Sequence, residues 1–432
     1  MSTLGRRADA SALQVLPAAV GSLDASIRHG HATLAAGSAL QLPAQVLHLA
    51  GSLNAEVMGF LGPASMVLEQ AGIHQILITA APVPADYRDG LAALDGSRPR
   101  GLARSVEWLE ASPARGRASP WRRWRAARDM LVSTLRRAPQ AAVHVHGFVA
   151  ALVALHARAR AGGHGFVYYS PHGSASLGRL RTLGGLLQSM ARSAAGTVPF
   201  HRVITSCAVE ARLLPHARTA PVHLAESPVA RAFFVQRRQP TREPLVIAGV
   251  LEDGLPAAER VARLAVLLGD EVVRARVRWA GLVGPGTAPL LRAAGIEAAP
   301  AGDEALLAAQ MGQAWVFVAP VAATRFPLLL AQAMAARVPC VALDSPFNGA
   351  LLKDGETGYL CRDLEEMLRR TRELVESPAL RERMGEAAHA EAARRFDEGL
   401  FRQALLLGYG APPPATATAA VPELRMAAPP WP

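Results

Sequence analysis

Short apolar runs alternate with helix-length stretches along most of the chain. Before residue 236, strand-length runs occur at residues 46–49, 76–79, 142–146, 166–169 and 203–205. One helical pattern ends near residue 71, and another spans residues 149–160. The segment QRRQPTREP at 236–244 has the composition of a linker, and apolar runs resume after it at 245–249, 277–281, 314–319 and 340–343. A repeated order of strand, loop and helix predicts doubly wound parallel sheets, here in two Rossmann-like halves.

The same pattern sets the expected domain limits. The chain ends are rich in Ala, Ser, Gly and Pro with weak periodicity, so we expect both to be disordered. The predicted order is a leader (1–42), an N-terminal Rossmann-like domain (43–238), a C-terminal Rossmann-like domain (239–395), a closing helix (396–410) and a tail (411–432). Ligands of open parallel sheets bind beyond the carboxyl ends of the strands, so the loops there should line a cleft.

Length and composition agree with this layout. The 432 residues are 50% hydrophobic, enough for two cores. The three cysteines, Cys207, Cys340 and Cys361, lie far apart and form no CxxC pair, which favours a reducing compartment over disulfides or a zinc site. The first residues lack the apolar region of a signal peptide, and no apolar run reaches the roughly 18 residues of a membrane span. We therefore expect a cytoplasmic protein without metal or cofactor.

The positive charge is concentrated in one stretch. The formal net charge is +11, and residues 98–137 contain eleven arginines against three acids. Within it, apolar residues share one helical face: Trp121, Trp124, Ala127, Leu131 and Leu135. The other sides carry Arg122, Arg123, Arg125, Arg136 and Arg137. Such a helix suits an anionic membrane surface, here the inner face of the membrane. Alternatively it packs its apolar stripe on the N-terminal sheet, and the two readings are compatible.

A nucleic-acid partner is not expected. Aromatic residues make up 5% of the chain, and no nucleic-acid-binding module is recognisable.

Residues 314–396 carry the most specific pattern. They begin AWVFVAPVAATRFPLLLAQAMAARVPCVALDSPFNGALLKDGETGYL and end in a helical stretch that closes on AEAARRF. This segment resembles the C-terminal half of glycosyltransferase family 4, the retaining GT-B enzymes. Looser similarity covers HVHG at 144–147, SPHG at 170–173 and ITS at 204–206. The resemblance implies an α/β GT-B fold, with two Rossmann-like domains facing a central cleft.

The resemblance also implies a function. A sugar would pass from a nucleotide-sugar donor to a lipid-linked or polysaccharide acceptor, with retention of configuration, in cell-envelope or exopolysaccharide biosynthesis. The donor is a substrate rather than a cofactor.

The expected donor site centres on the helix that follows Phe326 and Pro327. Proline in a first helical turn loses no hydrogen bond, and the free N–H groups there attract an anion such as a diphosphate. Leu328 opens this helix, and Gly249, in the first strand of the C-terminal half, completes the expected donor-binding set. The alternative is an ordinary buried helix between two strands.

Two departures from the family lie in this region. The two glutamates implied by the resemblance, at the donor sugar and at the ribose, are Thr324 and Gln332 here. Glutamine can still bind a ribose diol, whereas threonine cannot stabilise positive charge on the sugar. Acids (Glu252 and Asp253) stand where the family has cations. Arg325 is the hypothetical substitute, with a solvent-facing loop arginine as the alternative.

Other candidates line the N-terminal side. His172 ends an apolar strand beside Gly173 and is the expected polar catalytic group at the sugar, together with Thr324; its alternative is a capping or core histidine. His146 is a second candidate by the same reasoning. Gly51, Ser52 and Asn54 form the expected acceptor-side loop, because a glycine-rich turn admits close approach.

Two rival functions remain at this stage. A catalytically degenerate GT-B protein would serve as a binding or scaffold partner in polysaccharide assembly, and the missing charges favour it. A sugar phosphorylase would need a Schiff-base lysine, and Lys353, the one lysine of the chain, lies in an expected surface hairpin. Glu356 is a candidate for an additional carboxylate, and the favoured alternative is a structural place in that hairpin.

Overall fold

The computed structural model describes residues 41–82, 101–111, 119–173, 200–213, 220–250, 254–269, 274–281, 283–284, 286–298 and 303–410. All of these belong to one compact unit, which begins at residue 39. The predicted leader (1–42) and tail (411–432) lie almost wholly outside the described residues, as do Glu252 and Asp253.

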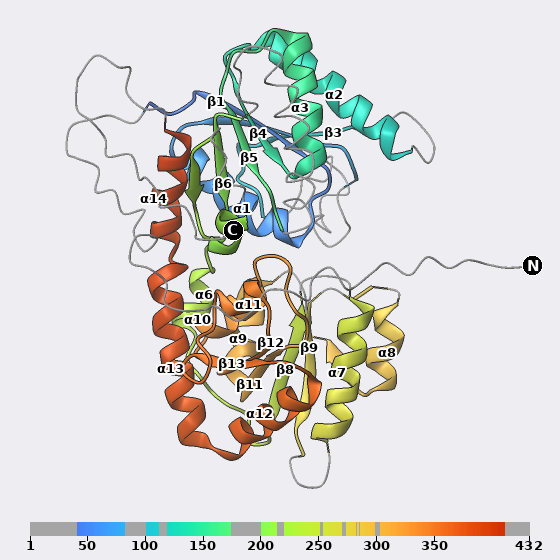
Figure 1. Ribbon diagram of the computed structural model, residues 1–432, viewed down its shortest axis with the longest axis vertical. Helices are drawn as coiled ribbons and strands as arrows, with labels where there is room; N and C mark the ends of the chain where they lie inside the picture. The colour runs from blue at the N-terminus through green and yellow to red at the C-terminus, as the bar shows by residue number, and fades with distance from the viewer. Residues whose placement is uncertain are drawn as a thin grey trace, which may run out of the picture. The chain divides into compact units, whose positions relative to one another are not determined.

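Two parallel sheets organise the described chain (Figure 1). The first has the order β3-β2-β1-β4-β5-β6-β7 and the second the order β10-β9-β8-β11-β12-β13. The strands of the first sheet are β1 (Gln45–Ala50), β2 (His74–Thr79), β3 (Glu107–Glu110), β4 (Ala142–His146), β5 (Val167–Ser170), β6 (Arg202–Thr205) and β7 (Val222–Leu224). Those of the second are β8 (Leu245–Val250), β9 (Arg276–Gly281), β10 (Glu297–Ala298), β11 (Val316–Ala319), β12 (Cys340–Leu343) and β13 (Gly358–Cys361).

The helices connect these strands in the order that the sequence predicted. They are α1 (Ala55–Gln70), α2 (Pro120–Arg137), α3 (Phe148–Ala161), α5 (Ala208–Leu213), α6 (Arg231–Val235), α7 (Leu255–Leu268), α8 (Thr287–Ala293), α9 (Glu304–Gln313), α10 (Leu328–Ala335), α11 (Pro346–Gly349), α12 (Leu364–Glu376), α13 (Pro378–Arg395) and α14 (Glu398–Tyr409). The doubly wound α/β prediction is confirmed. The strands that the apolar pattern missed are short or at sheet edges, where burial demands less hydrophobicity: β3, β7, β10 and β13.

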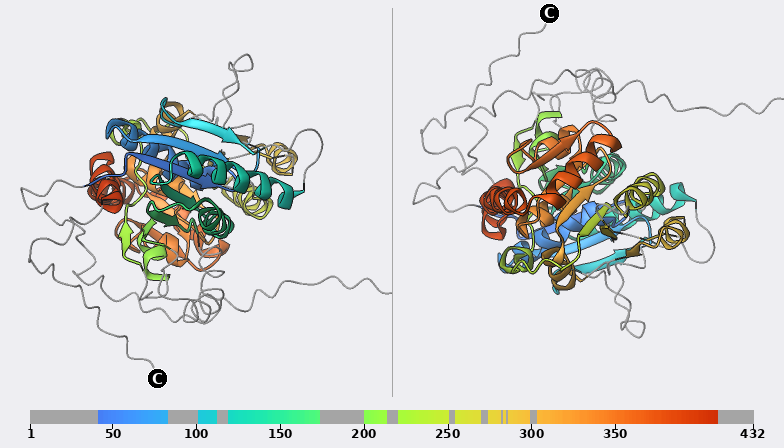
Figure 2. Two further views of the ribbon diagram at one scale, coloured as in Figure 1. Left: turned by 90° about the horizontal axis from the view of Figure 1, so that it is seen from above. Right: turned by 90° about the horizontal axis from the view of Figure 1, so that it is seen from below.

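Alternating side chains divide the first sheet between two helical layers. Leu47 and Leu49 of β1 belong to the core beneath α2 and α3. Those two helices lie side by side in the views of Figure 2. Val46 points the other way and joins the core made with α1 and α14. Because successive strand residues face opposite sides, His48 shares the face of Val46.

The C-terminal helix returns to the first sheet. α14 contacts α1, β6 and β7, and its residues Phe401, Leu405 and Tyr409 are buried with Phe60 and Tyr168. Asp397 caps the helix by accepting hydrogen bonds from the N–H groups of the first turn.

The predicted hairpin around Glu356 is wrong in one respect. Gly358–Cys361 forms strand β13, which pairs with β12 in parallel, so the turn at 354–357 leads into an edge strand rather than into a hairpin. The N–H of Leu360 donates to Asp354 Oδ1 (2.9 Å), which fixes this turn.

Candidate functional site

A cavity of ≈ 250 Å³ lies where loops of the two sheets meet. Its lining residues are Asn54, Glu56, Gly59, Ser206, Ser227, Gly249, Val250, Phe317, Ala319, Val321, Ala323, Arg325, Phe326, Pro327, Leu328, Leu329, Leu330 and Asn348. Among them Glu56 is the one carboxylate and Arg325 the one cation. The cavity therefore joins an apolar wall to a single pair of opposite charges.

The N-terminus of α10 forms one wall. Pro327 is the N-cap of this helix and makes no side-chain cap bond, so the proline stands one residue before the first turn rather than inside it. The N–H of Leu328 turns back to Phe326 O (3.0 Å). Leu329 and Leu330 follow in the first turn, where backbone N–H groups lack an acceptor within the helix. This end of α10 is suited to an anion.

Arg325 faces the other half of the chain. Its Nη1 lies 3.3 Å from Glu56 Oε2, with 32% of the arginine side chain and 7% of the glutamate side chain exposed. Glu56 stands in the first turn of α1, whose N-terminal dipole favours an anion. Arg325 is thus an ion-paired residue of the cavity, and the alternative of a plain solvent-facing arginine does not describe it.

The turn at Gly173 brings both halves together. Gly173 has a φ of +95°, and a methyl group added to it would lie 3.3 Å from Glu56 Oε1 and 3.4 Å from Arg325 Cβ. The same position is 3.5 Å from Thr324 O. Glu56 and the Thr324–Arg325 segment therefore approach one point from opposite sides.

Glu210 stabilises the Gly173 turn through hydrogen bonds. Its Oε1 accepts a hydrogen bond from the Gly173 N–H (2.6 Å), and its Oε2 accepts from the N–H and the hydroxyl of Ser206 (both 3.0 Å). Burial raises the pKa of Glu210, while these hydrogen bonds oppose the shift. Sequence reasoning missed Glu210, because a single acid in a short helix carries no recognisable pattern.

Four buried histidines lie behind the cavity. His48, His144 and His146 occupy the sheet face covered by α1 and α14, and His172 follows β5. His48 Nδ1 is 3.2 Å from His146 Nε2, and His146 Nδ1 is 3.0 Å from His172 Nε2. His144 bonds Tyr409 Oη (2.5 Å) and Ser170 Oγ (2.9 Å). In this set of four, the histidine cluster, hydrogen bonds link three rings, and the fourth, His144, lies against His146 with ring centroids 4.3 Å apart.

Burial keeps the cluster neutral. It lowers the pKa of His48 to about 4 and that of His172 to about 3, and Arg325 adds to the shift of His172. Burial also holds the pKa of His144 and His146 well below 6.5, helped by their histidine neighbours. His48, His144 and His146 are close enough to ligate a metal, but both ring nitrogens of His144 already have hydrogen-bond partners.

His172 has features of a core histidine and of a residue next to the site. Its Nε2 is satisfied by His146, as in a core histidine. Its Nδ1 is buried with no hydrogen-bond partner among the described residues. Its neighbour Gly173 reaches the cavity charges, although His172 itself and His146 do not line the cavity.

Two amides flank the apolar wall. Gln332 is buried on α10 and does not line the cavity; its Oε1 has no partner within the described chain. Asn348, which the sequence did not single out, donates from Nδ2 to Val321 O (3.0 Å) and Leu343 O (2.7 Å). Its Oδ1 has no partner in the described part of the structure.

At two of the predicted site glycines, neighbouring protein atoms leave little room for a side chain. A methyl group at Gly249 would lie 1.7 Å from Ala280 O on β9, so close strand packing already requires glycine there. A methyl group at Gly51 would lie 3.0 Å from the Trp124 ring. Ser52 and Asn54 are exposed, and Asn54 caps α1 by accepting from the Val57 N–H (2.9 Å).

Helix α2 shows both features expected of it. Ala127, Leu131 and Leu135 are buried against the first domain. Trp124 is half-buried, whereas Trp121 is 74% exposed. Arg122 and Arg125 are exposed, and Arg123 is half-exposed. The packed stripe thus ends in an exposed Trp and Arg cluster next to the Gly51 loop.

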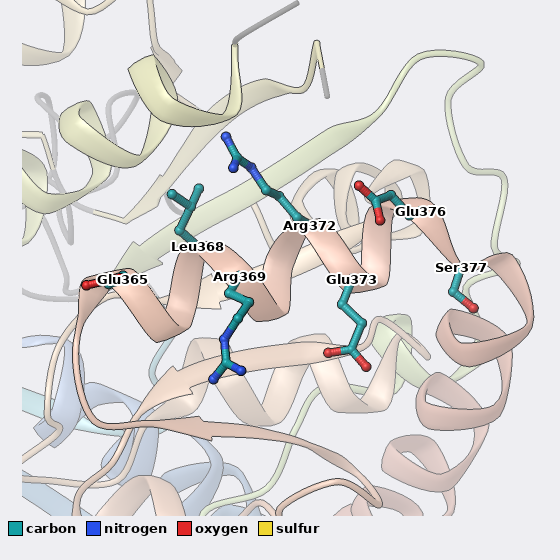
Figure 3. Close-up of a pocket in the computed structure, with 7 residues that line it drawn as sticks. All are labelled: Glu365, Leu368, Arg369, Arg372, Glu373, Glu376 and Ser377. Atoms are coloured by element: carbon teal, nitrogen blue, oxygen red, sulfur yellow. The ribbon is translucent and has the colours of Figure 1, made fainter. Parts of the chain in front are cut away.

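A second hollow runs along α12, away from these residues (Figure 3). It is lined by Glu365, Leu368, Arg369, Arg372, Glu373, Glu376 and Ser377 and shares none of them with the cavity. Glu356 and Lys353 pair with each other (3.4 Å) and line neither hollow. No helix in the described ranges is long and apolar enough to cross a membrane.

Comparison with known proteins agrees with this architecture. Residues 300–391 match the family model of the group 1 glycosyl transferases. The chain is 36% identical over 110 residues to phosphatidyl-myo-inositol mannosyltransferase of Mycobacterium leprae, a stretch covering 25% of this chain and 29% of that protein. The chain thus matches less than a third of the length of this relative.

Solved GT-B structures superimpose on most of the chain. Sucrose-phosphate synthase from Thermosynechococcus elongatus aligns with a TM-score of 0.61 at 15% identity, covering 83% of this chain and 96% of that one. HepE of Anabaena, solved in complex with UDP, aligns with a TM-score of 0.59 at 15% identity, covering 83% and 97%.

The described chain has the GT-B fold, and its residues 300–391 are similar to the group 1 glycosyl transferases. The family match falls on the segment that carried the resemblance in the sequence, and the two parallel sheets give the fold. In this GT-B protein the group 1 domain supplies α10, Arg325 and Asn348, while the N-terminal domain supplies Glu56 and the Gly173 turn.

Proposed function

We propose that this protein is a retaining glycosyltransferase that moves a sugar from a nucleotide donor to a lipid-linked or polysaccharide acceptor. The cavity supports this proposal because it places a helix N-terminus beside a cation, the combination that binds a diphosphate. HepE, which shares the fold, binds UDP. The proposed reaction belongs to cell-envelope or exopolysaccharide assembly and requires no metal or cofactor beyond the donor.

The acceptor side of the proposal rests on α2. The exposed Trp121 lies one helical turn from Trp124, which packs on Gly51 at the loop expected to face the acceptor. We place this end of the protein on the inner face of an anionic membrane, where lipid-linked acceptors are found. The relative from Mycobacterium leprae acts, by its name, on a phosphatidyl-inositol lipid.

Titration calorimetry against UDP- and GDP-sugars tests the donor. At least one donor is expected to bind with micromolar affinity, and Arg325→Ala should weaken it at least tenfold because the cavity loses its cation. Gln332→Ala tests the ribose contact separately. Absence of binding to every donor would refute the proposal. Binding without turnover would instead favour the second candidate, a degenerate GT-B partner of polysaccharide assembly. Thr324 favours this candidate because it stands where the resemblance implies a glutamate.

A further inference from the structure

We propose that Glu56 is the carboxylate that stabilises the reacting sugar in the cavity, in place of the charge that is absent at Thr324. The inference rests on the proposed transferase function. It concerns a residue of α1 that neither the family match at 300–391 nor the sequence motifs include.

The reaction requires such a charge. The bond between the sugar C1 and the donor phosphate oxygen breaks, and its electron pair leaves with the diphosphate. The acceptor hydroxyl oxygen forms the new bond to C1, and its proton passes to the released diphosphate. Positive charge develops on the sugar ring meanwhile, and a carboxylate fixed beside it lowers the barrier.

Glu56 is the residue positioned for this task. Of the described residues that line the cavity, it alone is a carboxylate, and its side chain is 7% exposed. A charge so little hydrated interacts strongly with a neighbouring charge. The first turn of α1 and the guanidinium of Arg325 stabilise the ionised form.

The Glu56 carboxylate also lies near the backbone of Thr324. Both approach the position of a Gly173 methyl group, Glu56 Oε1 at 3.3 Å and Thr324 O at 3.5 Å. The Glu56 carboxylate and the backbone of residue 324 therefore lie close to the same glycine, whereas the Thr324 side chain is exposed and does not line the cavity. The N-terminal domain has taken over a charge that the C-terminal domain lacks.

Arg325 can serve two anions at once. A guanidinium carries five N–H donors in a rigid fork. Nη1 faces Glu56 at 3.3 Å, and Arg325 lines the same cavity as the α10 N-terminus. Arg325 would then bind the donor phosphates and orient Glu56 toward the sugar attached to them.

The competing explanation is an ion pair that only joins the two domains. In that case Glu56→Gln and Arg325→Ala should behave alike, lowering donor affinity and thermal stability together. If Glu56 acts on the sugar, turnover should fall while donor affinity is retained.

The experiment begins with the full-length wild type and the nucleotide sugar that binds it in calorimetry. Release of nucleoside diphosphate, with water as acceptor, gives kcat. Glu56→Gln is expected to lower kcat by about 100-fold while the donor Kd stays within about threefold. Thr324→Glu in the Glu56→Gln background should restore kcat at least tenfold, since it returns a carboxylate at the position where the family resemblance implies one. Glu365→Gln, an exposed change on α12, is the control.

The outcomes separate the two proposals. A wild type that binds no donor, or binds without turnover, refutes the transferase function and this inference with it. A wild type that turns over while Glu56→Gln keeps its kcat refutes the role of Glu56 alone. Parallel losses of affinity in Glu56→Gln and Arg325→Ala, with no rescue by Thr324→Glu, assign the pair to domain bridging and overturn the inference.

Discussion

Individual side chains decide what the cavity can do. Motif reading placed Arg325 at the donor, and the structure gives it a partner, Glu56, 269 positions earlier in the chain (325 − 56). It also relates Glu56 to Gly173, whose lack of a side chain makes the approach possible. Neither contact has a sequence signature, because each joins residues that are far apart in the chain.

The histidine cluster makes a pH-dependent contribution to stability. These imidazoles are neutral in the fold, with the pKa of His48 near 4 and that of His172 near 3, whereas an unfolded histidine titrates near 6.5. Below pH 6.5 the unfolded chain therefore binds more protons than the folded one. The stabilisation is complete above that pH and is lost as the pH falls from 6.5 toward 4.

We expect the free energy of unfolding to fall by about 1 kcal/mol per cluster histidine between about pH 7.5 and about pH 5.5. Urea unfolding at both values measures the loss. His48→Asn should reduce it by about one histidine's share, and His156→Asn, at an exposed position of α3, should leave it unchanged. Equal losses in all three proteins would contradict this account.

Among the elements, α2 is the one for which the sequence left two compatible interpretations open. Its apolar stripe packs on the sheet through Leu131 and Leu135, as one reading predicted. Trp121 and its neighbouring arginines are exposed beyond the packed region, and the membrane interpretation stays a prediction.

If α2 docks on a membrane, the protein should bind vesicles that contain anionic lipid and leave them at high salt. Arg122→Ala/Arg125→Ala should weaken binding about tenfold or more, since each cation near an anionic surface contributes about 1 kcal/mol. The double variant Arg292→Ala/Arg383→Ala removes two exposed arginines elsewhere and should bind like the wild type. Co-sedimentation provides the comparison. Equal weakening in both variants would show that vesicle binding depends on net charge alone and not on α2.

At the scale of the whole molecule, the chain passes between the two domains twice, and the two passing segments contact each other. The Val229 N–H donates to Phe396 O (3.0 Å). Arg395 pairs with Glu226 (Nη2 to Oε1, 2.5 Å) and donates to Ala350 O (2.7 Å). The side chains of Arg395 and Glu226 are only 16% and 15% exposed.

Glu226→Gln should therefore lower the free energy of unfolding by about 2–3 kcal/mol, because the poorly hydrated guanidinium keeps only its longer pair with Glu391 (3.6 Å). Glu243→Gln is the matched control. Its pair with Arg276 is 3.5 Å long, and both side chains are more than 60% exposed, so the loss should be within about 0.5 kcal/mol. Denaturant unfolding compares the two, and similar losses would show that burial does not set the strength of the 226–395 pair.

The sequence by itself determined the fold and the place of the cavity. Apolar runs such as Val46–Leu49 must be buried on both faces, and their spacing with helices permits a parallel sheet, whose strand ends carry the ligand loops. Phe326 and Pro327 marked the start of α10 by local backbone chemistry. These signals are visible in sequence because each depends on residues a few positions apart.

Only the tertiary structure decided which charges meet. The Glu56–Arg325 pair, the support of Gly173 by Glu210 and the contact of His144 with Tyr409 join segments separated by 37 to 269 positions. Such contacts are fixed by how whole sheets and helices pack, and a short polar side chain looks alike in sequence whether it faces solvent or a buried partner. The cavity could be located from sequence, but its carboxylate could not.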